Sequence, residues 1–401
     1  MKRFLLNLLI SIMLMLNIDI GFAEELQEIL PRPSSQPSNF MIAQIPDTQG
    51  FMYSSTEIHC PHTNVSQIND MYEWIFSHHD SSCPADTKTG AGCYQYIFHV
   101  GDIVDGNGGD GDTMWSAAKN TYIQILNNNK VNVPFGFATG NHDYSGNGPG
   151  QGVYQPGNYD QAKDFLQTIY TQQGSYAPQF IAVSNEASSP FLAYKNFTIG
   201  HIKFIALNLP LGLPGNDAEF QTTQDFISKN QDSLIILNSH TFDSWGSSPN
   251  NEKLAQLYLN NKNVFMVLWG HEPSPVYPNG GFASIPGETI SRASNMPSVF
   301  KYRFDYQEGA NYSCSGSNMP QHPLLRIYSF SLDETNKTLT WQAYDVQSWN
   351  IQNSVYNDPA WDNAKNRINL GSKDITLLPN SQVTMDISKY IPTSLALDSN
   401  S

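Results

Sequence analysis

One pattern constrains the fold of this sequence more than any other. Five short apolar segments, of the kind that form buried strands, are each followed directly by polar residues. The side chains in question are Asp47, Asp102, Asn141, His240 and His271. In open α/β sheets, ligands bind at the carboxyl ends of the strands. We therefore expect these side chains to gather at one edge of a sheet.

The segments between these strands alternate between helical patterns and loops rich in Gly, Pro and Asn, which indicates an α/β fold. Strands are predicted at 40–46, 96–100, 133–138, 234–237 and 264–268, a β-hairpin at 191–198 and 202–209, and helices at 113–126, 159–171, 217–229 and 252–259. Beyond Phe282 the chain changes to β pairs at 324–331 and 338–344. The sequence pattern predicts no structure for the polar tail that follows.

The N-terminal residues have the features of a secretory signal peptide. Two basic residues precede an apolar run at 4–16, and Gly21 and Ala23 occupy positions −3 and −1 of a cleavage site. The apolar run is shorter than the roughly 20 residues that an uncleaved anchor requires. We therefore predict a signal peptide at 1–23, an extended leader at 24–39, and a secreted or periplasmic protein without a stable membrane span.

Composition excludes several classes of partner and fold. The net charge is −15, with 21 Lys and Arg against 36 Asp and Glu, so the chain repels a phosphate backbone and no nucleic-acid partner is expected. Only 14% of the residues are charged and 40% are hydrophobic, which is typical of a globular chain rather than a disordered one.

Four cysteines, an even number, favour disulfides in an exported chain: Cys60, Cys83, Cys93 and Cys314. The sequence does not choose among the possible pairings. A structural zinc site is the competing interpretation, but no C-x-x-C pair is present.

The polar residues after the strands form five motifs in order: Asp47-Thr48-Gln49, Gly101-Asp102-Ile103-Val104-Asp105, Gly140-Asn141-His142-Asp143, His240 and Gly270-His271. Together they resemble the calcineurin-like metallophosphoesterase superfamily, whose pattern is D-x-H, G-D-x-x-D, G-N-H-(D/E), H and G-H-x-H. The first motif looks like the branch of the family that begins with Asp-Thr-Gln. The resemblance covers roughly residues 40–275.

The resemblance implies a four-layer α/β/β/α metallophosphoesterase sandwich over residues 40–346, with a β-rich C-terminal extension at 347–401 of unknown role. It also implies a site for one or two divalent metal ions. Mixed oxygen and imidazole ligands suit Zn²⁺, Mn²⁺ or Fe. By this resemblance the metal ligands are Asp47 and Gln49 on the first ion, Asn141, His240 and His271 on the second, and Asp102 as the bridge, while His142 and Asp105 are the catalytic residues.

Two positions depart from the family pattern. Gln49 stands where the commoner form has His, and Pro273 occupies the second His position of G-H-x-H. Because proline has no side-chain donor, the first ion loses a ligand, which Glu272, water or a loop histidine would have to replace. The other histidines match no motif and are expected at the surface or in packing: His59, His62, His78, His79, His99, His201 and His322.

The function implied is that of an exported metallophosphoesterase, a hydrolase. It would cleave a phosphomonoester or phosphodiester by attack of a metal-bound hydroxide. The expected partner is a small-molecule or lipid phosphate ester. The alternative, favoured by Pro273, is a catalytically weakened phosphoesterase scaffold that acts as a binding protein.

Overall fold

The computed structural model describes residues 39–49, 66–80, 92–104, 111–143, 156–182, 191–210, 217–241, 249–271, 287–293, 295–304, 324–347, 375–377 and 382–392. The predicted signal peptide and almost all of the predicted leader lie outside these ranges.

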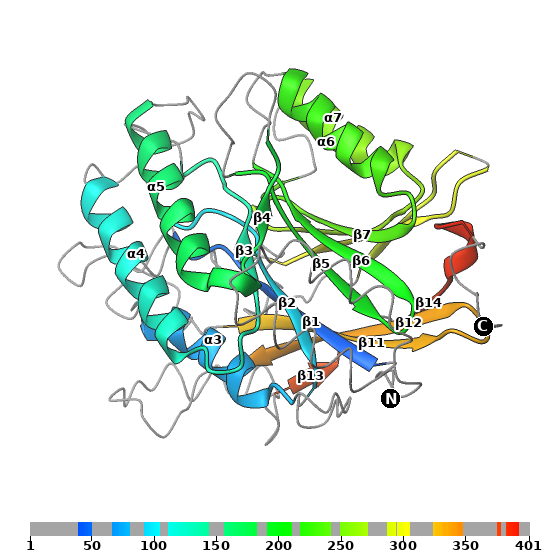
Figure 1. Ribbon diagram of the computed structural model, residues 1–401, viewed down its shortest axis with the longest axis horizontal. Helices are drawn as coiled ribbons and strands as arrows, with labels where there is room; N and C mark the ends of the chain where they lie inside the picture. The colour runs from blue at the N-terminus through cyan, green and yellow to red at the C-terminus, as the bar shows by residue number, and fades with distance from the viewer. Residues whose placement is uncertain are drawn as a thin grey trace, which may run out of the picture. The chain divides into compact units, whose positions relative to one another are not determined.

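The first sheet has seven strands, in the order β13-β12-β11-β1-β2-β3, with β14 also paired to β12 (Figure 1). The strands are β1 (Asn39–Ile45), β2 (Tyr94–His99), β3 (Phe135–Phe137), β11 (Leu324–Asp333), β12 (Thr338–Gln347), β13 (Ile375–Leu377) and β14 (Val383–Asp386). Strands β1, β2 and β3 are parallel to one another, whereas β11 runs antiparallel to β1. The loops that follow β1, β2 and β3 therefore leave the sheet at the same edge.

The second sheet also has seven strands, in the order β4-β5-β6-β7-β8-β10-β9. Its strands are β4 (Gln179–Phe180), β5 (Ala193–Ile199), β6 (Ile202–Asn208), β7 (Ser233–Asn238), β8 (Val264–Trp269), β9 (Glu288–Ile290) and β10 (Val299–Arg303). Strands β5 and β6 form the predicted hairpin, and β6, β7, β8 and β10 are parallel.

The helices are α3 (Ser66–His78), α4 (Gly111–Asn128), α5 (Pro156–Gln173), α6 (Asp217–Lys229) and α7 (Pro249–Asn260), with short 3₁₀ turns η3 (Gly174–Tyr176) and η6 (Ile387–Lys389). Helix α6 has the predicted bounds, and α4, α5 and α7 extend the predicted ranges by a few residues. Helix α3 was not predicted. Its buried residues Ile68, Met71, Tyr72 and Ile75 nevertheless follow the helical period.

Three apolar clusters define the layers. One lies between the two sheets and draws residues such as Phe98, Ile236 and Trp341 from their inner faces. A second joins the outer face of the first sheet to α3, α4 and α5, and a third joins the outer face of the second sheet to α6 and α7. Figure 1 shows these helices on the two outer sides of the paired sheets. The chain thus has the α/β/β/α sandwich predicted from its sequence.

The alternation of side chains along the strands produces this layering. On β6, Phe204 and Ala206 face the space between the sheets, while Ile205 and Leu207 face the helices. Because both faces of the central strands are covered, their sequences are almost continuously apolar, as is typical of parallel strands in α/β proteins.

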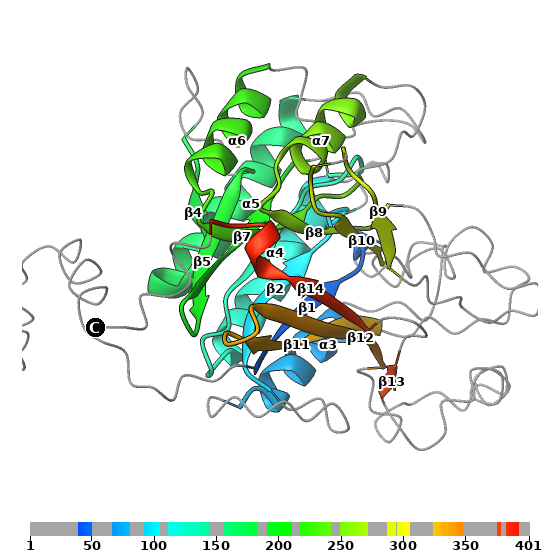
Figure 2. The ribbon, with the colours of Figure 1, turned by 90° about the vertical axis from the view of Figure 1, so that its right-hand side faces the viewer.

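The C-terminal part of the chain is β-rich and packs on the first sheet. Strand β14 pairs antiparallel with β12, and Figure 2 shows the two strands side by side. Met385, Ile387, Tyr390 and Ile391 are buried in the cluster between the sheets. Part of the segment predicted as a C-terminal extension therefore contributes to the core.

Two observations concern the membrane-span and cysteine predictions. Among the helices in the described ranges, none is both long enough and apolar enough to cross a membrane. Cys93 is not a free thiol. The other cysteines, Cys60, Cys83 and Cys314, lie outside the described residues, so the disulfide pairing stays a prediction.

Substitutions of Trp341 test the packing between the sheets. Trp341 lies on β12 of the first sheet, and its indole Nε1–H donates to the Tyr302 hydroxyl on β10 of the second, 2.8 Å away. The side chain is 1% exposed. We expect Trp341→Ala to lower the free energy of unfolding by about 3–5 kcal/mol through cavity formation. Trp341→Phe, which keeps a ring, should lose about half as much. Urea denaturation measures both values, and equal losses in the two variants would contradict this packing.

Candidate metal centre

The polar residues that follow the parallel strands of both sheets meet at one edge of the sandwich. Asp47, Asp102 and Asn141 follow β1, β2 and β3 of the first sheet, while His240 and His271 follow β7 and β8 of the second. Asp47, Asp102 and His240 are at most 1% exposed, and the other two are partly buried. Each sheet therefore supplies part of one buried polar group.

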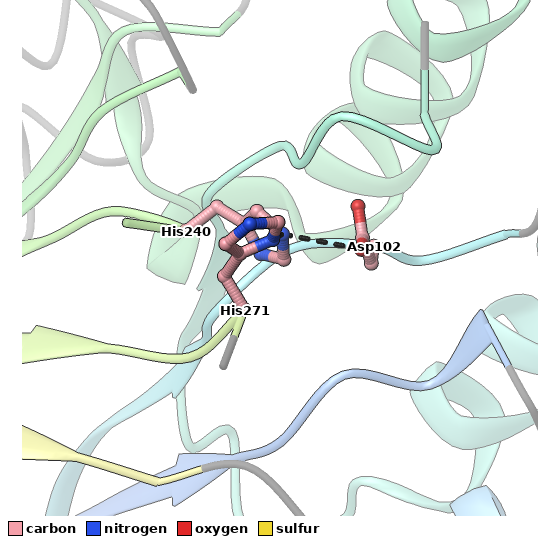
Figure 3. A group of neighbouring side chains, drawn as sticks. All are labelled: Asp102, His240 and His271. Atoms are coloured by element: carbon pink, nitrogen blue, oxygen red, sulfur yellow. Dashed lines mark hydrogen bonds and ion pairs between the residues drawn. The ribbon is translucent and has the colours of Figure 1, made fainter. Parts of the chain in front are cut away.

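Asp102, His240 and His271 form the centre of this group, as Figure 3 shows. Each offers one ligand atom, and these three atoms lie within 4.8 Å of one another. His240 Nε2 is 3.1 Å from Asp102 Oδ2 and 2.9 Å from His271 Nδ1. A carboxylate and two imidazoles in this arrangement are a donor set suited to a borderline divalent ion.

The orientation of His240 is set by a carbonyl group. Its Nδ1 is 3.0 Å from the Val100 carbonyl oxygen, which can only accept a hydrogen bond. Nδ1 therefore carries a proton, and Nε2 faces Asp102, His271 and the Asn141 Oδ1, which is 3.1 Å away. Ligand histidines in metal sites are commonly oriented by such a bond from the other ring nitrogen. Asp47 Oδ1 lies 3.4 Å from the same Nδ1.

The charges around His240 favour its protonated form. Burial disfavours its charged form, but the carboxylates of Asp102 and Asp47 raise the pKa of His240 well above its usual value. Burial would raise the pKa of Asp102, yet the neighbouring His240 and His142 hold it below its usual range. Burial and the charge of His240 lower the pKa of His271 to about 4. His271 is accordingly neutral at pH 7.

The glycines of two motifs are required by the close approach of their loops. Gly101 has φ 103°, and the following Asp102 has φ 47°, a left-handed conformation that is uncommon outside glycine. A Cβ on Gly140 would lie 1.9 Å from Asp102 Oδ1 and 2.6 Å from the Asp102 backbone nitrogen. Any larger side chain at position 140 would therefore displace Asp102.

Asp143 joins the loops after β2 and β3. Its Oδ1 accepts from the backbone N–H groups of Ile103 at 2.8 Å and Val104 at 3.1 Å, and its Oδ2 accepts from Gly140 N–H at 2.7 Å. Burial and the nearby Asp102 raise the pKa of Asp143 to about 7. Its place at the end of the Gly-Asn-His-Asp motif is the sequence signal that marks this residue.

His99 and Thr48 connect the loops after β1 and β2. His99 Nδ1 accepts from the Gly101 N–H at 3.1 Å, and its Nε2 lies 3.0 Å from Thr48 Oγ1. The Thr48 hydroxyl in turn donates to the Ile103 carbonyl at 3.2 Å. Burial, followed by the charge of His240, lowers the pKa of His99 to about 3. His99 is thus a neutral packing histidine, as expected, and it supports the loop that carries Asp102.

The remaining predicted residues are placed only in part. The backbone N–H of His142 donates to Asp102 Oδ1 at 2.9 Å, so His142 borders the group. Gln49 is 7% exposed, and its buried Oε1 has no hydrogen-bond partner in the part of the chain that the structure describes. A lone amide oxygen of this kind fits a metal ligand. Asp105, Glu272 and Pro273 lie outside the described residues, so their roles stay predictions.

A proton-release measurement tests whether His240 is a ligand. Because its pKa is raised, the ring is still protonated at pH 7, and an ion must displace that proton before Nε2 can bind. We expect about one proton released per ion at pH 7, with affinity rising further as the pH is raised. Calorimetric titration in buffers of different ionisation enthalpy measures this number. His201→Ala removes an exposed histidine and should leave it unchanged; a binding heat that does not depend on the buffer would contradict the assignment.

Comparison with known proteins agrees with this geometry. The model of the calcineurin-like phosphoesterase family matches residues 40–275, which is more than half of the chain and spans all five motifs. A search of curated proteins found no significant match. The matched region ends just beyond His271, and it contains each residue that the structure brings together at the edge of the sandwich. This chain belongs to the calcineurin-like phosphoesterase family.

Proposed function

We propose that this protein is an exported phosphoesterase that hydrolyses a phosphomonoester or phosphodiester with the help of divalent ions. One observation carries the proposal: Asp102 from one sheet and His240 and His271 from the other present their ligand atoms within 4.8 Å of one another. Structural packing alone does not require two imidazoles and a carboxylate from different sheets to converge on one point. Membership of the family supports the same chemistry.

The residues present fit an ion site. Asn141, His240 and His271 would hold one ion, Asp47 and Gln49 would hold its neighbour, and Asp102 would be shared. When bound, divalent ions neutralise charge on phosphoryl oxygens and lower the pKa of water. The protein's own part is to keep this site buried and its ligands oriented.

We infer that His142 assists the departure of the leaving oxygen. Its backbone N–H donates to Asp102 Oδ1, and its ring is near enough to help hold the pKa of the Asp102 carboxyl below its usual range. An imidazole in that position donates a proton or a hydrogen bond to the departing oxygen of the ester. Asp105, three residues after Asp102, would support the loop.

Export and substrate class are the finer parts of the proposal. The basic residues, apolar run and small residues of the first 23 positions support cleavage of a signal peptide and a secreted or periplasmic location. The net charge of −15 disfavours polyanionic substrates such as nucleic acid and leaves small-molecule or lipid phosphate esters.

A binding protein on a weakened phosphoesterase scaffold is the second candidate. Pro273 favours it, because the second histidine of the family pattern G-H-x-H is missing. The complete set of Asp102, Asn141, His240 and His271 argues for retained activity. Assays with added Mn²⁺ or Zn²⁺ against a panel of phosphate esters separate the two functions.

Asp102→Asn is the variant that tests the proposal most directly. It removes the negative charge at the centre of the group while keeping the size of the side chain, so hydrolysis should fall by about 10³-fold and ion binding should weaken. The matched control is Asp164→Asn, which removes a carboxylate from an exposed ion pair with Lys119 and should retain full activity. Rates on nitrophenyl phosphate and bis-nitrophenyl phosphate provide the measurement. A wild-type protein that hydrolyses no ester with any ion would favour the binding function.

His142→Ala separates proton donation from charge stabilisation. We expect ion content to stay unchanged and alkyl phosphate hydrolysis to slow by about 10²–10⁴-fold. Nitrophenyl phosphate should slow much less, because nitrophenolate leaves without a proton. Steady-state rates and elemental analysis of the same samples measure both effects. Loss of the ion would show that His142 is a ligand, and equal slowing of both substrates would indicate charge stabilisation.

A further inference from the structure

The centre is divided between two sheets that no ladder of paired strands connects in the described residues; one backbone bridge, between Thr139 after β3 and Pro210 after β6, joins them near this edge. Within a sheet, hydrogen bonds between strands fix the register, but two stacked sheets are held together by side-chain packing, which is less directional. The distance between Asp102 and His240 therefore depends on whatever sets the position of one sheet against the other at this edge. Two amide side chains lie there.

Asn238 provides the first connection. It ends β7, two residues before His240, and its Nδ2 donates across the gap to the His99 carbonyl on β2 at 2.8 Å. The same Nδ2 is 2.9 Å from Asn208 Oδ1, and Asn208 Nδ2 donates to the Tyr96 hydroxyl, also on β2, at 2.6 Å. Asn238 is 0% exposed. His99, which accepts the bond from Asn238, is three residues before Asp102 in the chain.

Gln44 provides the second connection. It lies on β1, three residues before Asp47, and its Nε2 donates to the Trp269 carbonyl at the end of β8, 3.2 Å away. Its Oε1 accepts from the Tyr328 hydroxyl at 2.6 Å, which orients the amide. Gln44 is also 0% exposed. Trp269 is two residues before His271, so this bond reaches the other histidine of the centre.

Neither amide is needed to satisfy the carbonyl that it contacts. The His99 carbonyl already accepts from Ala138 N–H at 2.8 Å, and the Trp269 carbonyl already accepts from Phe304 N–H at 2.8 Å. In addition, the buried Oδ1 of Asn238 has no hydrogen-bond partner in the described part of the chain, and such an atom disfavours folding. Stability alone therefore does not explain polar side chains on the otherwise apolar inner faces of β1 and β7.

We propose that Asn238 and Gln44 are positioning residues that set the spacing between the two halves of the metal centre. Asn238 holds the end of β7, which precedes His240, against the end of β2, which precedes Asp102. Gln44 holds the end of β8, which precedes His271, against the end of β1, which precedes Asp47. The inference rests on the proposed metal site and not on hydrolysis. It predicts that removing either amide weakens ion binding although no ligand is changed.

Asn238→Ala and Gln44→Met are the test variants, and Asn263→Ala is the matched control. Asn263 is also 0% exposed, and its Nδ2 donates to the Asn230 carbonyl at 2.9 Å, at the opposite edge of the second sheet. Mn²⁺ and Zn²⁺ affinities of the full mature chain are measured by competition with a chelator. The absorption spectrum of the Co²⁺-loaded chain reports ligand geometry, and the melting temperature without added ion reports stability.

We expect Asn238→Ala and Gln44→Met each to weaken ion binding by about 10–100-fold, the range found for residues that orient metal ligands. The Co²⁺ spectrum should change with them. Asn263→Ala should lower the melting temperature by about as much as Asn238→Ala, a few degrees, and leave both ion readouts unchanged. Gln44→Met, which preserves side-chain length, keeps the test decisive if Asn238→Ala fails to fold.

Two results would overturn the inference. Ion affinities within about twofold of wild type in both test variants would show that packing and the Thr139–Pro210 bridge align the sheets without the two amides. An equal loss in Asn263→Ala would show that the effect is general destabilisation. A wild-type chain that binds no divalent ion would instead refute the proposed function, and the inference with it.

Discussion

The contact between Asp102 and His240 is the interaction on which the rest of this structure depends. It joins a carboxylate from one sheet to an imidazole from the other, 3.1 Å apart and almost fully buried. A charged pair in such a place is unfavourable unless further bonds complete it. The carbonyl of Val100, the amide oxygen of Asn141 and the backbone N–H of His142 provide those bonds. The surrounding loops are shaped to bring these groups into contact.

The need to hold Asp102 and His240 in contact explains several features that lie far apart in the sequence. Gly140 admits Asp102 where a Cβ would collide with it, and Asp143 uses both carboxylate oxygens to bind three backbone N–H groups of two loops. His99 remains neutral because it is buried, and it connects the loops after β1 and β2. These residues contact no predicted ion directly. Their common effect is to hold the ligands at fixed separations, which is what selective binding of a small ion demands.

The family assignment and the geometry agree on the half of the site that contains Asp102, Asn141, His240 and His271. The other half is less complete, because Gln49 offers a neutral amide oxygen and Pro273 offers no donor. An amide binds a divalent cation more weakly than a carboxylate, which carries charge. The two halves of the proposed centre therefore differ in chemistry.

The sequence by itself predicted nine of the strands, most helices and the residues that line the edge, and the family resemblance of its motifs implied the sandwich; the short strands β4, β9, β13 and β14 and the strand β10 were not predicted. These features depend on local periodicity and on motifs whose residues are adjacent in the chain. The helix at Ser66–His78 was missed even though its apolar residues are helically spaced. Only the tertiary structure revealed the roles of His99, Asp143, Gln44 and Asn238. Their partners lie on strands distant in sequence, so their function depends on how the two sheets stack, and no local pattern encodes that.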